Sequence, residues 1–174
     1  MKNKVLIVVD MQKDFVFGSL GTPEAKNIVE KVTQKISDYE TNGHAVIFTM
    51  DTHQENYLDT SEGKKLPVKH CVEGTDGWKI CGEIWENTNR PIVVKKPTFG
   101  SVELMKCLEE YDEIEFVGVC TSICVVSNVL MAKAYYPDKK IVVDASCCAC
   151  VTPESHAAAL TTMKMCQIDV VEGY

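Results

Sequence analysis

The chain has 174 residues, of which 45% are hydrophobic and 25% are charged, and its formal net charge at pH 7 is −7. This length and composition are typical of one globular domain, and we predict a single domain over residues 1–174. The excess of acidic residues argues against nucleic acid or an anionic membrane as the main partner, because basic surfaces bind both.

The first apolar run covers residues 5–9 and ends at Asp10. It is too short to cross a membrane, and no small-residue cleavage site follows it, so we interpret it as a strand and not as a signal peptide. The nine cysteines are an odd number and lie in apolar segments. Without an export signal, this cysteine usage indicates reduced thiols in a cytoplasmic protein.

Six short β-rich runs follow one another along the chain. They are continuously apolar and do not alternate with polar residues, which is typical of parallel strands covered on both faces. The predicted strands are residues 5–9, 45–50, 92–94, 114–119, 141–143 and 168–171.

Helical patterns lie between most of these runs. Three helix starts are marked by Thr22-Pro23-Glu24, by Ser101 and by Thr152-Pro153-Glu154, which are typical N-terminal caps. The residues expected to face inward are Ile28, Val32 and Ile36 in the first helix, Leu104, Met105 and Leu108 in the second, and Ala158 and Leu160 in the last. Alternating strands and helices predict an α/β fold: one three-layer domain with a six-stranded parallel sheet flanked by helices.

The candidate catalytic and binding residues lie at the ends of the predicted strands. Strands one and two end at Asp10 and Asp51, the third ends at Lys95 and Lys96, and Cys124 follows the fourth. Because ligands bind beyond the carboxyl ends of parallel strands, we expect these side chains to gather on one rim. The long irregular segment of residues 52–76 is also expected to be functional.

A thiol, a carboxylate and an ammonium on one rim suit acyl transfer. Cys124 near a helix start would favour the thiolate, and Asp10 could accept its proton and later donate one. Lys96 would hold Asp10 ionised and favour the thiolate. Backbone N–H groups of Cys120 and Cys124 could bind the oxyanion that forms on the substrate.

Each residue alone has another reading. Asp10 could be a helix cap, Lys96 a solvated strand end, and Cys124 a core residue. Cys147 and Cys150 have C-x-x-C spacing, which is found in zinc and redox sites, but neither a second pair nor a nearby histidine accompanies them, so we interpret them as buried apolar side chains.

Three segments resemble motifs of the isochorismatase-like cysteine hydrolases. Residues 8–15, VVDMQKDF, resemble the opening signature D-x-Q-x-D-F, and residues 118–125, GVCTSICV, resemble G-V-x-T-D-x-C-V. Residues 96–99, KPTF, are similar to the K-x-x-Y/F segment after the third strand. The resemblance implies a triad of Asp10, Lys96 and Cys124, and it covers the chain from residue 5 to about residue 160.

The resemblance also implies an oxyanion hole and a substrate pocket. It places a cis peptide bond between Val119 and Cys120, next to the backbone groups that would bind the oxyanion. It makes Phe15 and Phe99 aromatic walls of the pocket. A homo-oligomer is implied as well.

A metal site is implied by two further segments. Residues 51–53, DTH, resemble the D-x-H that begins the metal site of nicotinamidases in this family, and His70-Cys71 resembles their downstream H-C segment. The expected ligands of a divalent metal, Zn²⁺, Fe²⁺ or Mn²⁺, are Asp51, His53, Glu62 and His70, with Glu55 as the alternative to Glu62. Asp51 and His53 could instead be hydrogen-bonded loop anchors.

The sequence departs from the nicotinamidase pattern at the pocket walls, since Thr52 and Ser122 replace an aromatic and an aspartate. We therefore predict a metal-assisted cysteine amidohydrolase that cleaves a small, nicotinamide-like carboxamide to acid and ammonia through a thioester. N-carbamoyl and ureido compounds are alternative substrates of the same triad.

Two further readings stay open. True isochorismatases cleave a vinyl ether and need no cysteine. The presence of Cys124 argues against this activity. A non-enzymatic signalling module of the receiver type would need paired acids after the first strand. His156 is interpreted as structural.

Overall fold

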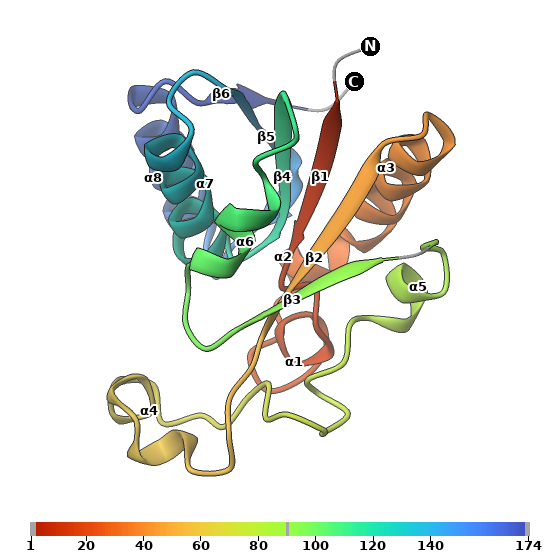
Figure 1. The fold of residues 1–174 in the computed structure, drawn as a ribbon. Helices are drawn as coiled ribbons and strands as arrows, with labels where there is room; N and C mark the ends of the chain where they lie inside the picture. The colour runs from red at the N-terminus through yellow and green to blue at the C-terminus, as the bar shows by residue number, and fades with distance from the viewer. Residues whose placement is uncertain (1–2, 90, 173–174) are drawn as a thin grey trace.

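The computed structural model describes residues 3–89 and 91–172, so residues 1–2, 90 and 173–174 of the predicted domain lie outside the described part. Six parallel strands form one sheet in the order β3-β2-β1-β4-β5-β6, with helices on both faces (Figure 1). The predicted fold class is therefore confirmed. The strands are β1 (Lys4–Val9), β2 (Ala45–Asp51), β3 (Ile92–Lys96), β4 (Glu113–Val119), β5 (Lys140–Ala149) and β6 (Asp169–Val171).

Strands β1 and β4 match the prediction, whereas β3 and β5 differ from it. Strands β1 and β4 are buried along nearly their whole length, as expected of strands covered on both faces. Ile92 and Val93 of the edge strand β3 are 46% and 37% exposed. Strand β5 has ten residues where three were predicted, because Asp144 and Ser146 interrupt the apolar run that marks it in the sequence.

The helices form two layers on the sheet (Figure 1). One layer holds α2 (Pro23–Asn27), α3 (Val29–Thr41) and α5 (Gly82–Trp85), and the other holds α6 (Val102–Cys107), α7 (Val126–Tyr135) and α8 (Pro153–Met165). Alternate residues of β1 serve the two layers: Leu6 and Val8 pack toward α3, whereas Val5, Ile7 and Val9 pack with residues of α6, α7 and α8. This two-sided burial explains the continuous apolar runs.

All three predicted helix caps are present. The side chains of Thr22, Ser101 and Thr152 accept hydrogen bonds from the backbone N–H three residues later, at 3.0, 3.1 and 3.2 Å. The predicted inward face of α8 is partly wrong: Ala159 and Met163 are buried, Ala158 is exposed, and Leu160 is partly buried. A shift of one residue turns a helical side chain by about 100°, so the four-residue step from 159 to 163 defines the true face.

The long segment after β2 is partly ordered into short helices. It contains a 3₁₀ turn, Tyr57–Asp59, and α4 (Ser61–Lys65), and α1 (Lys13–Val16) lies near it after β1. These elements gather beyond the carboxyl ends of the central strands (Figure 1). No helix of the described residues is long and apolar enough to cross a membrane.

Candidate active site

Asp10 lies immediately after β1 with a backbone φ of +49°, a left-handed conformation that aspartate tolerates better than most residues. Its side chain is fully buried. Oδ1 accepts a hydrogen bond from the Thr49 hydroxyl at 2.7 Å, and Oδ2 lies 2.6 Å from the Lys96 ammonium. Side chains of β2 and β3 therefore fix both carboxylate oxygens.

Lys96 is the last residue of β3 and is 1% exposed. Its Nζ donates to the Thr98 carbonyl oxygen at 3.0 Å and lies 3.6 Å from both Cys124 Sγ and Asp51 Oδ1. Burial alone would lower the pKa of Lys96, but the charges of Asp10, Cys124 and Asp51 raise it. The ammonium is therefore charged and lies among three acidic groups.

Cys124 lies in a π-helical turn, Thr121–Val125, that follows β4 and precedes α7. The peptide bond between Val119 and Cys120 at its start is cis, as expected. The Val125 N–H donates to the Cys120 carbonyl oxygen at 3.1 Å, the five-residue spacing of a π-helix. The structure thus brings the three expected triad side chains together, from β1, β3 and the turn after β4.

The ionisation of the thiol differs from the expectation. Burial and the charge of Asp10 raise the pKa of Cys124 well above its usual range, although Lys96 lowers it. Lys96 favours the thiolate, as predicted, but burial and the charge of Asp10 outweigh it, so the thiol of the free protein is neutral. Burial also raises the pKa of Asp10, against the charge of Lys96, which makes this carboxylate a stronger base.

Two buried polar residues that the sequence analysis missed hold the site together. The Asn128 amide donates to the carbonyl oxygens of Cys124 and Phe99 at 2.8 and 3.0 Å, and its Oδ1 accepts from the Ser101 N–H at 2.9 Å. Thr49 is the other, through its hydroxyl on Asp10. A polar residue within an apolar helix or strand pattern was the available signal.

The four expected metal ligands form one cluster. Their ligand atoms all lie within 4.8 Å of one another. His53 Nε2 lies 3.0 Å from Asp51 Oδ2 and 3.7 Å from Glu62 Oε1, and His70 Nε2 lies 3.5 and 3.7 Å from the same two atoms. Glu55 is instead an exposed partner of Lys69.

This donor set fits a divalent cation. Ligand atoms at about 2.0–2.1 Å from a tetrahedral zinc ion are about 3.3 Å apart, close to the observed spacings. His70 Nδ1 donates to the Val68 carbonyl oxygen at 2.8 Å, which leaves the Nε2 lone pair toward the cluster. Burial and the charge of Asp51 raise the pKa of Glu62. A bound cation would relieve this crowding of carboxylates.

The loop that carries the histidines is tied to the sheet. The side-chain amide of Gln12 donates to the Asp51 carbonyl oxygen and accepts from the Asp51 N–H, at 2.8 and 2.7 Å. The ring of Tyr57 packs against His53 and His70, with centroids 4.6 and 4.9 Å apart. Tyr57 was not expected from the sequence, because nothing in the loop pattern marks it as buried.

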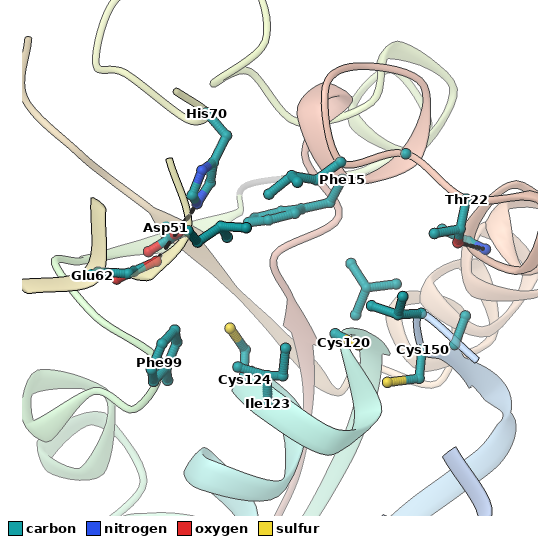
Figure 2. Close-up of a pocket in the computed structure, with 17 residues that line it drawn as sticks. Phe15, Thr22, Asp51, Glu62, His70, Phe99, Cys120, Ile123, Cys124 and Cys150 are labelled. Atoms are coloured by element: carbon teal, nitrogen blue, oxygen red, sulfur yellow. Dashed lines mark hydrogen bonds and ion pairs between the residues drawn. The ribbon is translucent and has the colours of Figure 1, made fainter. Parts of the chain in front are cut away.

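A cavity of about 450 Å³ opens onto both groups (Figure 2). Phe15 and Phe99 line it, as expected, and Cys124, Asp51, Glu62 and His70 face it from one side. Its other lining residues are largely apolar: Leu20, Gly21, Thr22, Ala25, Leu66, Val119, Cys120, Ile123, Ala149, Cys150 and Val151. A small molecule in this cavity would touch the metal cluster and the thiol together.

His156, Cys147 and Cys150 lie in different parts of the fold. His156 Nδ1 and the Thr121 hydroxyl form a hydrogen bond at 2.8 Å, so His156 supports the start of the π-helical turn. Cys147 is buried in the core beneath α2 and α3, whereas Cys150 lines the cavity. The C-x-x-C pair therefore does not act as one site.

Comparisons with known proteins agree with this geometry. A match to the isochorismatase domain covers residues 4–173. The chain is 29% identical to the uncharacterized isochorismatase family protein PncA of Bacillus subtilis, over 91% of this chain and 92% of that protein. Two solved structures are similar: nicotinamidase/pyrazinamidase PncA from Bacillus subtilis (TM-score 0.86, 25% identity, 98% and 100% coverage) and the zinc complex of pyrazinamidase from Pyrococcus horikoshii (TM-score 0.85, 28% identity, 99% and 99% coverage).

Proposed function

The chain belongs to the isochorismatase family, and we propose that it is a metal-assisted cysteine amidohydrolase that converts a small aromatic carboxamide to the acid and ammonia. Its relatives support a hydrolase of amide C–N bonds. The observation that carries the proposal is the single cavity shared by Cys124 and the Asp51, His53, Glu62 and His70 cluster.

Acylation begins with a proton transfer. Asp10 takes the proton of the Cys124 thiol as the sulfur attacks the amide carbon, which agrees with a thiol that is neutral in the free protein. Lys96, 2.6 Å from Asp10 and 3.6 Å from Cys124 Sγ, stabilises the negative charge as it moves between them. The backbone N–H groups of Cys120 and Cys124 are proposed to bind the oxyanion.

The C–N bond then breaks, and Asp10 returns the proton to the departing nitrogen, which leaves as ammonia. In the second half, Asp10 takes a proton from water as the water oxygen attacks the thioester. The acid departs and the proton returns to Cys124. One amide and one water give one acid and one ammonia.

The cluster of Asp51, His53, Glu62 and His70 would hold the cation. When bound, the cation supplies a Lewis acid that accepts a lone pair from the substrate and so orients its carboxamide. Two imidazoles and two carboxylates suit Zn²⁺, Fe²⁺ or Mn²⁺. The zinc-bound pyrazinamidase to which the chain is similar favours zinc.

The cavity walls favour a neutral, planar substrate. Phe15, Phe99 and Ile123 offer apolar surface, and among the described residues that line the cavity none is a lysine or arginine. The carboxylate of an N-carbamoyl amino acid would therefore lack a basic side chain. This contrast favours an aromatic carboxamide over the carbamoyl and ureido alternatives.

A reducing compartment is part of the proposal. All nine cysteines, each in the described part of the chain, are unpaired. This agrees with the expected cytoplasmic location. The homo-oligomer remains a prediction.

Ammonia release tests the function. Nicotinamide and pyrazinamide, with added zinc, iron or manganese, are expected to release ammonia faster than an N-carbamoyl amino acid does. Cys124→Ala is expected to lower turnover by more than about a thousandfold, because no other group forms the thioester.

Cys166→Ala is the matched control, since Cys166 is exposed and lies outside the cavity. It is expected to retain wild-type turnover. Substantial turnover by a folded Cys124→Ala protein would show that the nucleophile is wrong. A preference for carbamoyl compounds would overturn the proposed substrate class.

A further inference from the structure

A second thiol of the cavity wall, Cys150, has three hydrogen-bond partners. It follows directly after β5, and its Sγ lies 2.9 Å from the Ser122 hydroxyl and 3.3 Å from the Ser155 hydroxyl. The Cys120 thiol is the third partner. The Ser155 hydroxyl donates to the sulfur, and hydrogen bonds donated to a sulfur stabilise its thiolate.

The pKa of Cys150 is lowered, whereas the pKa values of the other two thiols that line the cavity are raised. Burial opposes its ionisation, but the hydrogen bonds from Cys120, Ser122 and Ser155 lower the pKa of Cys150 to about 7. Burial raises the pKa of Cys120 to about 12, and the pKa of Cys124 is also raised. About half of the Cys150 side chains are therefore thiolates at neutral pH, beside the neutral Cys120 thiol.

Cys120 is partly buried and Cys150 is 4% exposed. Cys120 and Cys150 line the cavity and lie next to each other in its wall (Figure 2). They come from different elements, the start of the π-helical turn and the end of β5, and they are 30 residues apart in the chain. Cys147 is buried in the core on the α2 and α3 side of β5 and is not part of the wall.

We propose that Cys120 and Cys150 form an oxidant-sensitive dithiol in the cavity wall, which small-molecule disulfides convert reversibly to an intramolecular disulfide. This site is separate from the Asp10, Lys96 and Cys124 side chains. It requires no catalytic turnover, so it stands independently of the proposed substrate.

The reaction consumes one small disulfide, RSSR. The Cys150 thiolate attacks one sulfur, the S–S bond of RSSR breaks, and a mixed disulfide forms as RS⁻ departs. RS⁻ takes the proton of Cys120 and becomes RSH. The Cys120 sulfur then attacks the Cys150 sulfur, the mixed disulfide breaks, and the second RS⁻ departs. This second RS⁻ takes up from the solvent the proton that Cys150 released when it ionised. The two cysteines are oxidised by two electrons, and RSSR is reduced to two RSH.

The cross-link would displace the start of the π-helical turn that carries Cys124. Cys120 is the first residue after the cis peptide, and its backbone N–H is a proposed oxyanion donor. A disulfide to Cys150 would pull this residue toward β5 and remove the Ser122 and Ser155 contacts of the thiolate. We expect turnover to fall by at least about tenfold and to return with dithiothreitol, because a displaced oxyanion donor costs about 10²–10³ in rate.

Mass spectrometry tests the proposal without reference to activity. The reduced full-length protein is incubated with glutathione disulfide and then digested without reduction. We expect a peptide that joins Cys120 to Cys150, with a mass about 2 Da below the sum of the two reduced peptides. Cys120→Ala is expected to stop at a glutathione adduct on Cys150, and Cys150→Ala to give neither product.

Cys147→Ala is the matched control for the C-x-x-C spacing and is expected to give the same cross-link as the wild type. Cys166, which is exposed, reports that the reagent reacts. A Cys147–Cys150 link, a link to Cys124, or modification of Cys166 alone would each overturn the proposal. Loss of ammonia release in an unoxidised protein would bear on the proposed function instead.

Discussion

Asp51 serves two groups of the site at once. Its Oδ2 faces the imidazoles of His53 and His70, and its Oδ1 lies 3.6 Å from the Lys96 ammonium. Burial opposes ionisation of Asp51, but hydrogen bonds with the two histidines and the charge of Lys96 lower its pKa. One buried carboxylate therefore joins the proposed metal site to the triad, and its charge is compensated from both sides.

Removal of this carboxylate should affect metal binding first. Asp51→Ala takes away one of four ligands, and we expect the affinity for zinc to fall by at least about tenfold, since even residues behind the ligands change affinity by that amount. Elemental analysis after dialysis against limiting zinc measures the change.

Glu55→Ala is the control for this measurement. Glu55 lies in the same loop, but its side chain is 84% exposed and pairs with Lys69. It should leave the bound metal unchanged. Equal metal content in the Asp51→Ala and wild-type proteins would contradict the metal site.

Among the elements, the turn after β4 decides where Cys124, the proposed nucleophile, lies. Gly118 has φ +115°, and a Cβ there would lie 2.2 Å from the Val9 carbonyl oxygen, so glycine lets β4 approach β1 just before the turn. The π-helical turn then places Cys124 beside Lys96. Thr121 is held in turn by His156 of α8.

Helix α8 depends on its N-terminal cap. Thr152 and Ser155 form a capping box, in which each side chain bonds the other's backbone N–H, at 3.2 and 3.3 Å. Thr152→Ala is expected to lower the free energy of unfolding by about 1 kcal/mol, because it leaves an N–H of the first turn without its partner. Urea unfolding measures this loss.

Thr162→Ala makes the same chemical change at an exposed position within α8. It is expected to be neutral or slightly stabilising, because alanine has the higher helix propensity. Equal destabilisation by both substitutions would show that the cap does not act through Thr152.

In the whole molecule, a buried ion cluster joins helix α3 to the sheet. Lys35 of α3 lies 2.5 Å from Glu115 of β4 and 2.6 Å from Asp144 of β5, and all three are less than 10% exposed. The Tyr39 hydroxyl donates to the other oxygen of Glu115 at 2.5 Å. This cluster lies outside the residues that line the active-site cavity.

Lys35→Met should destabilise the entire fold. It leaves two buried carboxylates without their shared cation, and breaking a buried pair in this way costs about 3–5 kcal/mol. Denaturant unfolding should show a lower midpoint.

Lys31→Met, at an exposed position of the same helix, should change the unfolding midpoint little. Adding Glu115→Gln and Asp144→Asn to Lys35→Met should recover part of the loss, because the buried charges are then gone. Full stability of Lys35→Met alone would contradict this account.

The sequence by itself determined the order of elements and the residues at the strand ends. Continuous apolar runs marked the central strands because both faces of the sheet are covered, and the helix caps are local hydrogen bonds between neighbours in sequence. Asp10, Asp51 and Lys96 were placed on one rim because parallel strands end at the same edge. The motif around Cys124 identified the thiol that joins these three residues in the site.

Tertiary structure alone decided the ionisation and the support of the site. Burial, which depends on every neighbouring element, keeps the Cys124 thiol neutral, and no local pattern could indicate it. Thr49, Asn128 and Tyr57 act through partners distant in the sequence, as does the contact of Cys120 with Cys150. Such contacts depend on how the chain packs, since side chains far apart in the sequence meet only after the sheet and helices have assembled.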